Sequence, residues 1–579
     1  MRLLLSLLVP ASLLADGVLR GRVIDGDTAQ PVACTVTVRT PDGKVLSDHP
    51  SFRGGFRVEG EFTKAVPAGR LTVTVSRGFD YVPVEQTIEV REGESTDLKV
   101  SLRRQSPLRR LGWVTGDSHV HMAHGERTIE VDFPFAALSG RAEGLDYLAL
   151  AQHWYVAKTT PEELADVCLF SSTSDFLLTW NLEAPKNYWK GDAGKCVGHG
   201  WTVGMKGRTP DGRDAIAELL SLSAWDYESE KVSVPNFEIQ ALIHSLGGIV
   251  SYTHPHRWWT GKWGGQGIYP VEENKFVSNL AAELPFDTVA GPTYDMIDIL
   301  MRVNEREVNR KGLALWFMLL NHGYRITATA SSDATFDNPG GAVPGAVRNY
   351  TRIDGPVTMD RIAAAMKAGR NFVTSGPLIL FRAGKNQVGD VVKAPAKLAA
   401  EIQAWPAGTK IELIRNGEVV RRFDSDQATF EIDERETAWY VARALGSSDT
   451  QVAITNPIYF ESSTYRAPQP ATAHVRATIA GPASGTVEVL EYVGRDPVVR
   501  KTVPFTGRAV ELDAPATARL RVRAPGYEPQ TKSIYMDTPE LLSTTLTLRS
   551  ETLNDWATFD RIRKLLGDVR MSFALAQSK

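Results

Sequence analysis

Hydrophobic and polar residues alternate along most of the first hundred positions. The segments 18–25, 33–40, 70–78 and 87–104 place apolar side chains at about every second position, with Gly, Pro and Asp between the segments. Successive side chains of a β-strand point to opposite faces, so this pattern predicts short strands buried on one face. Closely spaced short strands are typical of a β-sandwich. We expect one over residues 17–104.

From about residue 107 to residue 377 continuous apolar runs alternate with amphipathic segments. The apolar runs have the composition of parallel strands that are buried on both faces; they are 145–151, 175–181, 247–253 and 325–331. The amphipathic segments have helical spacing; they are 214–225, 235–246 and a long one around 294–322. The alternation predicts an α/β domain over 105–380 whose parallel sheet closes as a distorted barrel.

The alternating pattern returns after this domain. Residues 381–466 and 467–550 each predict a further β-sandwich, and residues 551–579 predict a C-terminal helix. One stripe of that helix is apolar and should pack on its own chain; it consists of Trp556, Phe559, Ile562, Leu565 and Leu566. A chain of 579 residues is too long for one hydrophobic core, so several domains are expected.

Residues 1–16 have the pattern of a secretory signal peptide. Met1 and Arg2 precede an apolar run that ends at Ala15. We therefore expect a secreted or periplasmic protein, with an uncleaved membrane anchor as the alternative. No later run is long and apolar enough to predict a membrane span.

Composition narrows the class of partner. A net charge of −3 and the lack of a basic stripe argue against nucleic acid and against an anionic membrane surface. The partner that we expect is a small-molecule substrate. The oligomeric state is not predicted. Three cysteines allow one disulfide, for which Cys168 and Cys196 are better placed than Cys34. None has zinc-finger spacing, so a metal would be held by nitrogen and oxygen.

Metal-binding side chains follow the predicted strands. His119 and His121 share one face of an extended segment, because their spacing is two. His153, Glu183, His254 and Asp333 each come just after an apolar run, where the carboxyl ends of parallel strands meet. Nine of the eleven histidines lie between residues 119 and 322. This joint pattern predicts a metal site at one end of the sheet.

The same residues belong to an ordered set of motifs. The set is GDSHVH, AQHW, NLE, GHGWTVG, YTHP and SSDA. It resembles the polymerase-and-histidinol-phosphatase (PHP) superfamily, and its nearest branch looks like the CehA/McbA-type metallohydrolases. Residues 17–104 resemble carboxypeptidase regulatory-like sandwiches, and the segment RLRVRAPGYEP resembles a second one.

The resemblance to the PHP superfamily implies a site for two divalent metals, Zn, Mn or Fe. His119, His121, Glu183 and Asp333 would hold the first metal, and Glu183 would bridge to a second. His199 and His254 would complete the second site. Two cations about 3.5–4 Å apart can share one water.

Other residues have predicted roles beside the metals. Asp117 would orient a ligand imidazole through its other ring nitrogen, and His153 would be a spare ligand or would hydrogen-bond the water. Gln152 and Thr335 stand where the superfamily has further ligands, which favours two metals over three; a third metal near His124 and His153 stays open.

An aromatic and basic segment beside His254 predicts a substrate pocket or lid. The substrate-binding residues expected there are Trp154, His256, Arg257 and Trp258.

The resemblance implies hydrolysis by a metal-bound hydroxide. The branch favours an ester, amide or carbamate. The wider superfamily favours a phosphoester, which Arg208, Arg257 or Arg348 would clamp. A non-catalytic envelope or carbohydrate-binding protein with a degenerate barrel is the alternative outside enzymes.

Overall fold

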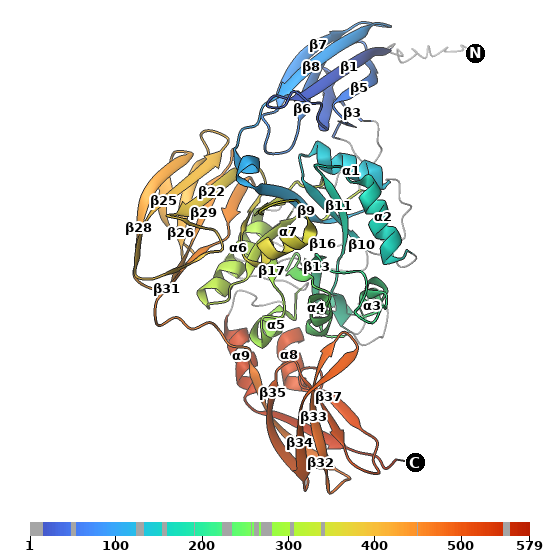
Figure 1. Ribbon diagram of the computed structural model, residues 1–579, viewed down its shortest axis with the longest axis vertical. Helices are drawn as coiled ribbons and strands as arrows, with labels where there is room; N and C mark the ends of the chain where they lie inside the picture. The colour runs from blue at the N-terminus through green and yellow to red at the C-terminus, as the bar shows by residue number, and fades with distance from the viewer. Residues whose placement is uncertain are drawn as a thin grey trace, which may run out of the picture.

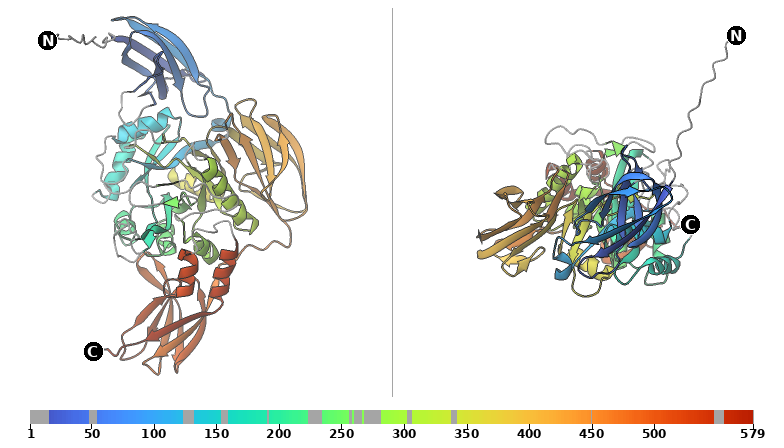
Figure 2. Two further views of the ribbon diagram at one scale, coloured as in Figure 1. Left: turned by 180° about the vertical axis from the view of Figure 1, so that it is seen from behind. Right: turned by 90° about the horizontal axis from the view of Figure 1, so that it is seen from above.

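The computed structural model describes residues 16–47, 54–122, 132–152, 159–189, 192–222, 234–255, 258–259, 266–267, 281–301, 306–336, 342–448, 450–547 and 556–578. Three β-sandwich regions surround one α/β region (Figure 1). The first sandwich lies at one end of the long axis and the last at the other. The remaining one lies on a side of the α/β region, an arrangement that Figure 2 shows from behind and from above.

The first sandwich consists of two sheets, in the orders β5-β1-β8 and β3-β2-β6-β7, with β4 on β2. Its apolar positions alternate with exposed ones and enclose a core that includes Leu19, Val36 and Val73. Its strands are β1 (Asp16–Asp25), β2 (Cys34–Arg39), β3 (Val45–Leu46), β4 (Phe56–Val58), β5 (Glu61–Pro67), β6 (Gly69–Ser76), β7 (Val84–Val90) and β8 (Ser95–Leu102).

The α/β region contains parallel and antiparallel strands. They are β9 (Trp113–His121), β10 (Tyr147–Gln152), β11 (Leu177–Leu182), β12 (Lys186–Trp189), β13 (Asp192–Val203), β14 (Ile249–Tyr252), β15 (Trp258–Trp259), β16 (Gln266–Gly267), β17 (Met296–Met301), β18 (Thr327–Ser331), β19 (Ala334–Thr335), β20 (Arg348–Arg352) and β21 (Asn371–Thr374). The helices are η1 (Leu108–Leu111), α1 (Phe133–Ala142), α2 (Pro161–Ser171), α3 (Ala215–Leu222), α4 (Asn236–Ser245), α5 (Leu284–Ala290), α6 (Arg306–Asn321) and α7 (Met359–Lys367).

The four predicted apolar runs form β10, β11, β14 and β18, but the long helix around 294–322 is wrong in its first part. Met296–Met301 is strand β17, and the helix α6 begins only at Arg306. The strand is buried at every position between β14 and β18. An apolar run buried on all sides does not distinguish strand from helix by its periodicity.

The sheet of the α/β region is split and mixed rather than purely parallel. One part has the order β11-β10-β9-β20-β21, and a separate sheet has the order β12-β13-β14-β17-β18. β20 runs antiparallel to β9, and β13 runs antiparallel to β14. Among the described residues no strand ladder joins the two sheets, so the predicted barrel is not closed by backbone pairing.

Asparagine side chains join the two sheets at the edge of β18. Asn349 accepts a hydrogen bond from the Ala330 N–H (3.1 Å) and donates one to the Ala330 carbonyl (2.7 Å). Asn456 does the same for Ala328, at 2.8 and 3.0 Å, and Asn371 also donates to the Ala328 carbonyl. A carboxamide carries the same donor and acceptor as a peptide group, so these side chains take the place of a neighbouring strand. We call Asn349, Asn371 and Asn456 the asparagine seam.

The first sheet continues past residue 380 into the second sandwich, since β21 pairs with β30. This sandwich consists of β22 (Leu378–Ala383), β23 (Asn386–Gln387), β24 (Val391–Lys393), β25 (Ala396–Trp405), β26 (Lys410–Arg415), β27 (Glu418–Phe423), β28 (Gln427–Glu434), β29 (Ala438–Leu445), β30 (Val452–Thr455) and β31 (Ile458–Glu461).

The last sandwich has sheets in the orders β35-β32-β38 and β34-β33-β36-β37. The predicted C-terminal helix is shorter than residues 551–579, because α9 ends at Leu566 and strand β38 follows it. Phe559, Ile562 and Leu566 of α9 are buried against the chain's own core. The elements are β32 (Thr472–Ala480), β33 (Ser484–Val493), β34 (Asp496–Thr506), β35 (Ala509–Pro515), β36 (Arg519–Arg523), β37 (Gln530–Ser533), α8 (Pro539–Thr547), α9 (Trp556–Leu566) and β38 (Val569–Ala574).

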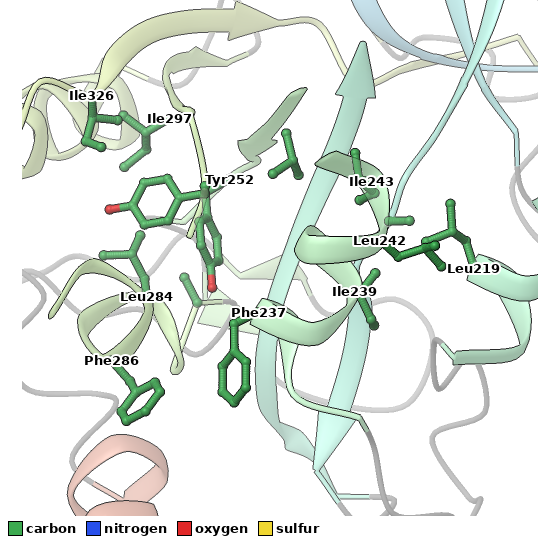
Figure 3. Close-up of a cluster of buried hydrophobic side chains, with 14 of the residues drawn as sticks. Leu219, Phe237, Ile239, Leu242, Ile243, Tyr252, Leu284, Phe286, Ile297 and Ile326 are labelled. Carbon is green, nitrogen blue, oxygen red and sulfur yellow. The ribbon is translucent and has the colours of Figure 1, made fainter. Parts of the chain in front are cut away.

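The largest core lies under the helices of the α/β region and reaches the last sandwich. Figure 3 draws Phe237 of α4, Leu284 of α5, Tyr252 of β14 and Ile297 of β17 as members of one buried cluster. The ring of Phe286 in α5 packs against Tyr535 with centroids 4.2 Å apart and planes tilted by 32°, which joins the α/β region to the last sandwich.

Two other sequence predictions concern the cysteines and the membrane. Cys34 and Cys168 are buried free thiols, so Cys168 does not form the disulfide with Cys196 for which the sequence made it a candidate. Cys168 packs in the apolar core under α2, where a small hydrophobic side chain fits. The described helices include none with the length and hydrophobicity needed to span a membrane.

Replacing Asn456 with Ala should lower the free energy of unfolding by about 2 kcal/mol, because it leaves the buried N–H of Ala328 without its partner and the Ala328 carbonyl with the bond from Asn371 alone. Urea denaturation measures the change. Asn386→Ala is the matched control, since the bond described for the Asn386 side chain goes to the Ala383 carbonyl of its own hairpin. Equal losses of unfolding free energy in the two variants would show that the asparagine seam does not stabilise the fold more than an ordinary hairpin side chain does.

Candidate metal centre

His119 and His121 lie at the end of β9 and point to the same side of the strand. Both side chains are fully buried. Their Nε2 atoms are 3.0 Å apart and face each other. Two imidazole nitrogens that converge in this way can bind one cation.

Glu183 and Asp333 bring carboxylate oxygens to these histidines from two other strand ends. Glu183 directly follows β11, and Asp333 lies between β18 and β19. Asp333 Oδ1 is 3.6 Å from His119 Nε2 and 3.4 Å from His121 Nε2, while Glu183 Oε2 is 3.6 Å from His121 Nε2. Donor atoms about 2.1 Å from a tetrahedral cation lie about 3.4 Å from one another, so the spacing fits one.

A second group forms around the other oxygen of Glu183. His199 comes from β13 and His254 from the end of β14. Glu183 Oε1 is 3.1 Å from His199 Nδ1 and 3.6 Å from His254 Nε2. The donor atoms of Glu183, His199 and His254 all lie within 4.8 Å of one another, as do those of His119, His121 and Glu183. Glu183 therefore belongs to both groups through different oxygens, which is the geometry of a bridging carboxylate.

Burial sets the protonation states that a metal requires. It lowers the pKa of His119 to about 3 and that of His199 to about 4, so both rings are neutral near pH 7. Burial alone would raise the pKa of Glu183, but Lys186, His199 and His254 lower it well below its ordinary value. Neutral imidazoles and an ionised carboxylate are the forms that bind divalent metals.

Two of these residues have an unusual backbone. His254 has φ of 34° and Asp333 has φ of 48°, in the left-handed region that residues other than glycine rarely adopt. Such strain persists where the surrounding structure fixes it, and it is concentrated at functional sites. The conformation supports a role for both residues beyond packing.

Asp117 lies beside the centre, but it does not contact an imidazole nitrogen in the way the sequence suggested. Its carboxylate accepts hydrogen bonds from the backbone N–H groups of His119 (3.3 Å), Ser332 (3.3 Å) and Gly345 (2.7 Å), and from the Ser332 hydroxyl. It thus joins the end of β9 to the residue before Asp333. The ring of His119 instead contacts Thr253, whose Oγ1 is 3.1 Å from its Nδ1. Burial raises the pKa of Asp117 to about 6.

Lys186 is a further residue of the centre that the sequence pattern does not reveal. This buried residue begins β12, and its Nζ donates a hydrogen bond to Glu183 Oε2 at 2.5 Å. It also pairs with His199 across the β12–β13 ladder. The only available signal was its position three residues after Glu183.

Several residues with predicted roles at the metals or the substrate lie outside the described residues. They are His153, Trp154, His256 and Arg257, together with His124. Of Trp258 the structure describes the backbone, in the two-residue strand β15 that pairs with β16.

Two predicted phosphate-binding arginines have other partners. Arg208 forms an ion pair with Glu162 (2.6 Å). Arg348 donates to the carbonyls of Gly345 and Glu143, and its guanidinium lies 4.2 Å from the ring centroid of Phe79. Neither arginine is placed to clamp a phosphate at this centre.

Comparisons with known proteins give a distant likeness. No family model and no curated protein matches the chain. One similar solved structure is a two-domain protein from Bacteroides vulgatus that contains a predicted PHP-like metal-dependent phosphoesterase; the match covers 60% of this chain and 95% of that chain, at 11% identity and a TM-score of 0.29.

Other solved structures match less well. BcpA, the major pilin subunit of Bacillus cereus, matches over 40% of this chain and 85% of its own, at 8% identity and a TM-score of 0.13. A beta-glucuronidase of Parabacteroides merdae matches over 90% and 77%, at 10% identity and a TM-score of 0.17. TM-scores this low do not establish a common fold, so the function of this chain has to be inferred from the residues of its own centre.

Proposed function

We propose that this protein is a metal-dependent hydrolase with a centre for two divalent cations. The observation that carries the proposal is the position of Glu183, whose two carboxylate oxygens face two separate groups of buried histidines. His119, His121 and Asp333 would hold one cation, and His199 and His254 the other, with Glu183 shared. The nitrogen and oxygen ligands suit Zn, Mn or Fe. When bound, the metals would activate a water and stabilise negative charge on the substrate.

The charge of the centre favours an anionic substrate, and we therefore place a phosphoester first. The centre contains the buried carboxylates of Glu183, Asp333 and Asp117, and Lys186 adds a buried ammonium. Two divalent cations and the Lys186 ammonium together carry more positive charge than three carboxylates can neutralise. The excess of positive charge would attract a phosphoester and hold it at the reacting end.

An ester, amide or carbamate is the second candidate. Arg208 and Arg348, two of the three arginines expected to clamp a phosphate, are bonded elsewhere. The resemblance of the motifs to the CehA/McbA-type branch points in the same direction. In this case Lys186 would serve to hold Glu183 rather than to attract the substrate.

Glu183→Gln should remove most of the bound metal, because one residue contributes to both groups. Elemental analysis of the purified full-length protein should give about two metals per chain for the wild type and less than one for the variant. Glu434→Gln is the matched control, since Glu434 is equally buried but pairs with Arg415 in the second sandwich. A wild type without stoichiometric metal, or a Glu183→Gln variant that retains it, contradicts the proposal.

A panel of aryl phosphoesters, aryl esters and aryl carbamates decides the substrate class. We expect the highest kcat/KM for a phosphoester, and a loss of about tenfold or more for that substrate in Lys186→Met, since a hydrogen bond to a charged group contributes about 1.5–3 kcal/mol. Lys186→Arg retains the charge and should keep more of the activity.

The metal content of each Lys186 variant has to be measured in the same sample, because Lys186 also bonds to Glu183. A preference for esters or carbamates that Lys186→Met leaves unchanged would replace the first candidate with the second.

A further inference from the structure

Asp298 lies in the interior of the α/β region and takes no part in the ligand set described above. It is fully buried on β17. Its carboxylate accepts hydrogen bonds from Ser331 Oγ (2.6 Å), Trp201 Nε1 (2.9 Å) and Thr329 Oγ1 (2.8 Å). Burial raises the pKa of Asp298, whereas hydrogen bonds from Ser331, Trp201, Thr329 and Thr253 lower it.

Thr253 connects this carboxylate to the metal centre. The residue lies between β14 and His254 and is fully buried. The pairing of β14 with β17, with Tyr252 opposite Ile297, brings Thr253 beside Asp298, and its hydroxyl is one of the groups that lower the pKa of that carboxylate. On its other side, Oγ1 of Thr253 is 3.1 Å from Nδ1 of His119. The side chains therefore form a continuous line from Asp298 through Thr253 to His119.

The chemistry of this line determines which nitrogen of His119 carries the proton. A carboxylate only accepts hydrogen bonds, and a threonine hydroxyl has one proton to donate. Thr253 must therefore donate to Asp298 and use its oxygen to accept from Nδ1–H of His119. The Nε2 atom then keeps its lone pair, and Nε2 is the atom that faces His121 and Asp333.

We propose that Asp298 is a positioning residue of the metal centre, which acts through Thr253 to fix the tautomer and the orientation of His119. The inference rests on the proposed function for its consequence, metal affinity, but the tautomer itself is a property of the protein without metal. Partners of this kind, which bond to the distal nitrogen of a metal-binding histidine, typically change metal affinity by about 10–100-fold when they are removed.

The test compares Thr253→Val, Thr253→Ser, Asp298→Asn and Thr329→Val in the full-length protein. The affinity for Zn²⁺ is measured by competition with a chromogenic chelator, alongside thermal melts of the metal-free proteins. We expect Thr253→Val and Asp298→Asn to bind Zn²⁺ about 10–100-fold more weakly, and Thr253→Ser, which keeps the hydroxyl, to bind like the wild type.

Thr329→Val is the matched control, because Thr329 also bonds to Asp298 but has no contact with His119 in the described structure. It should lower stability and leave the affinity for Zn²⁺ unchanged. Thr253→Val with wild-type affinity, or Thr329→Val with the same loss as Thr253→Val, would overturn the proposal.

A second measurement does not depend on metal. Nitrogen-15 NMR of histidine-labelled, metal-free protein reports the tautomer of His119, whose signal is identified by its loss in His119→Gln. We expect protonation at Nδ1 in the wild type and a changed tautomer signal in Asp298→Asn. Protonation at Nε2 in the wild type would refute the inference. A wild type that shows the Nδ1 tautomer but binds no Zn²⁺ would refute the proposed function and leave the tautomer assignment standing.

Discussion

The free edge of β18 imposes the constraint on which the rest of the α/β region depends. Peptide groups buried inside a protein need hydrogen-bond partners, and in the part of the chain that the structure describes no backbone ladder joins the two sheets there. Asn349, Asn371 and Asn456 meet the requirement with their carboxamides. Asp333 follows β18 within two residues, so the bonds that fix this strand also fix the distance between Asp333 and the histidines of β9. The seam thereby links the stability of the fold to the geometry of the centre.

The centre is built in the same way, from buried side chains that provide one another with hydrogen-bond and charge partners. Glu183 accepts a hydrogen bond from Lys186 and faces two groups of histidines. Asp117 accepts hydrogen bonds from the backbone at the end of β9 and after β18. Each buried charge has a partner of opposite sign or a set of donors, which keeps the desolvation cost tolerable. Removing one member of such a network leaves several others unsatisfied, so its effects on stability and on binding are expected to be coupled.

The sequence located most of the donor atoms that lie together, because the carboxyl ends of strands meet at one place and Glu183, His254 and Asp333 all follow apolar runs. It did not locate Lys186 or Thr253, since a lysine or threonine in a strand has many ordinary roles. The strand at Met296–Met301 was assigned to a helix, because full burial removes the periodicity that separates the two. The asparagine seam has no local signal: Asn456 and Ala328 are 128 residues apart, and only the folded chain brings them together.

That separation has a consequence for the order in which the chain acquires its structure during synthesis. At about 5–20 residues per second, a ribosome needs on the order of ten seconds to make the residues between Ala328 and Asn456. Over that interval β18 has emerged while its partner has not, and the sheet that carries Asp333 lacks part of its support. The α/β region and the second sandwich are therefore expected to complete their folding together, whereas the first sandwich, whose described strands all precede residue 103, has no such dependence.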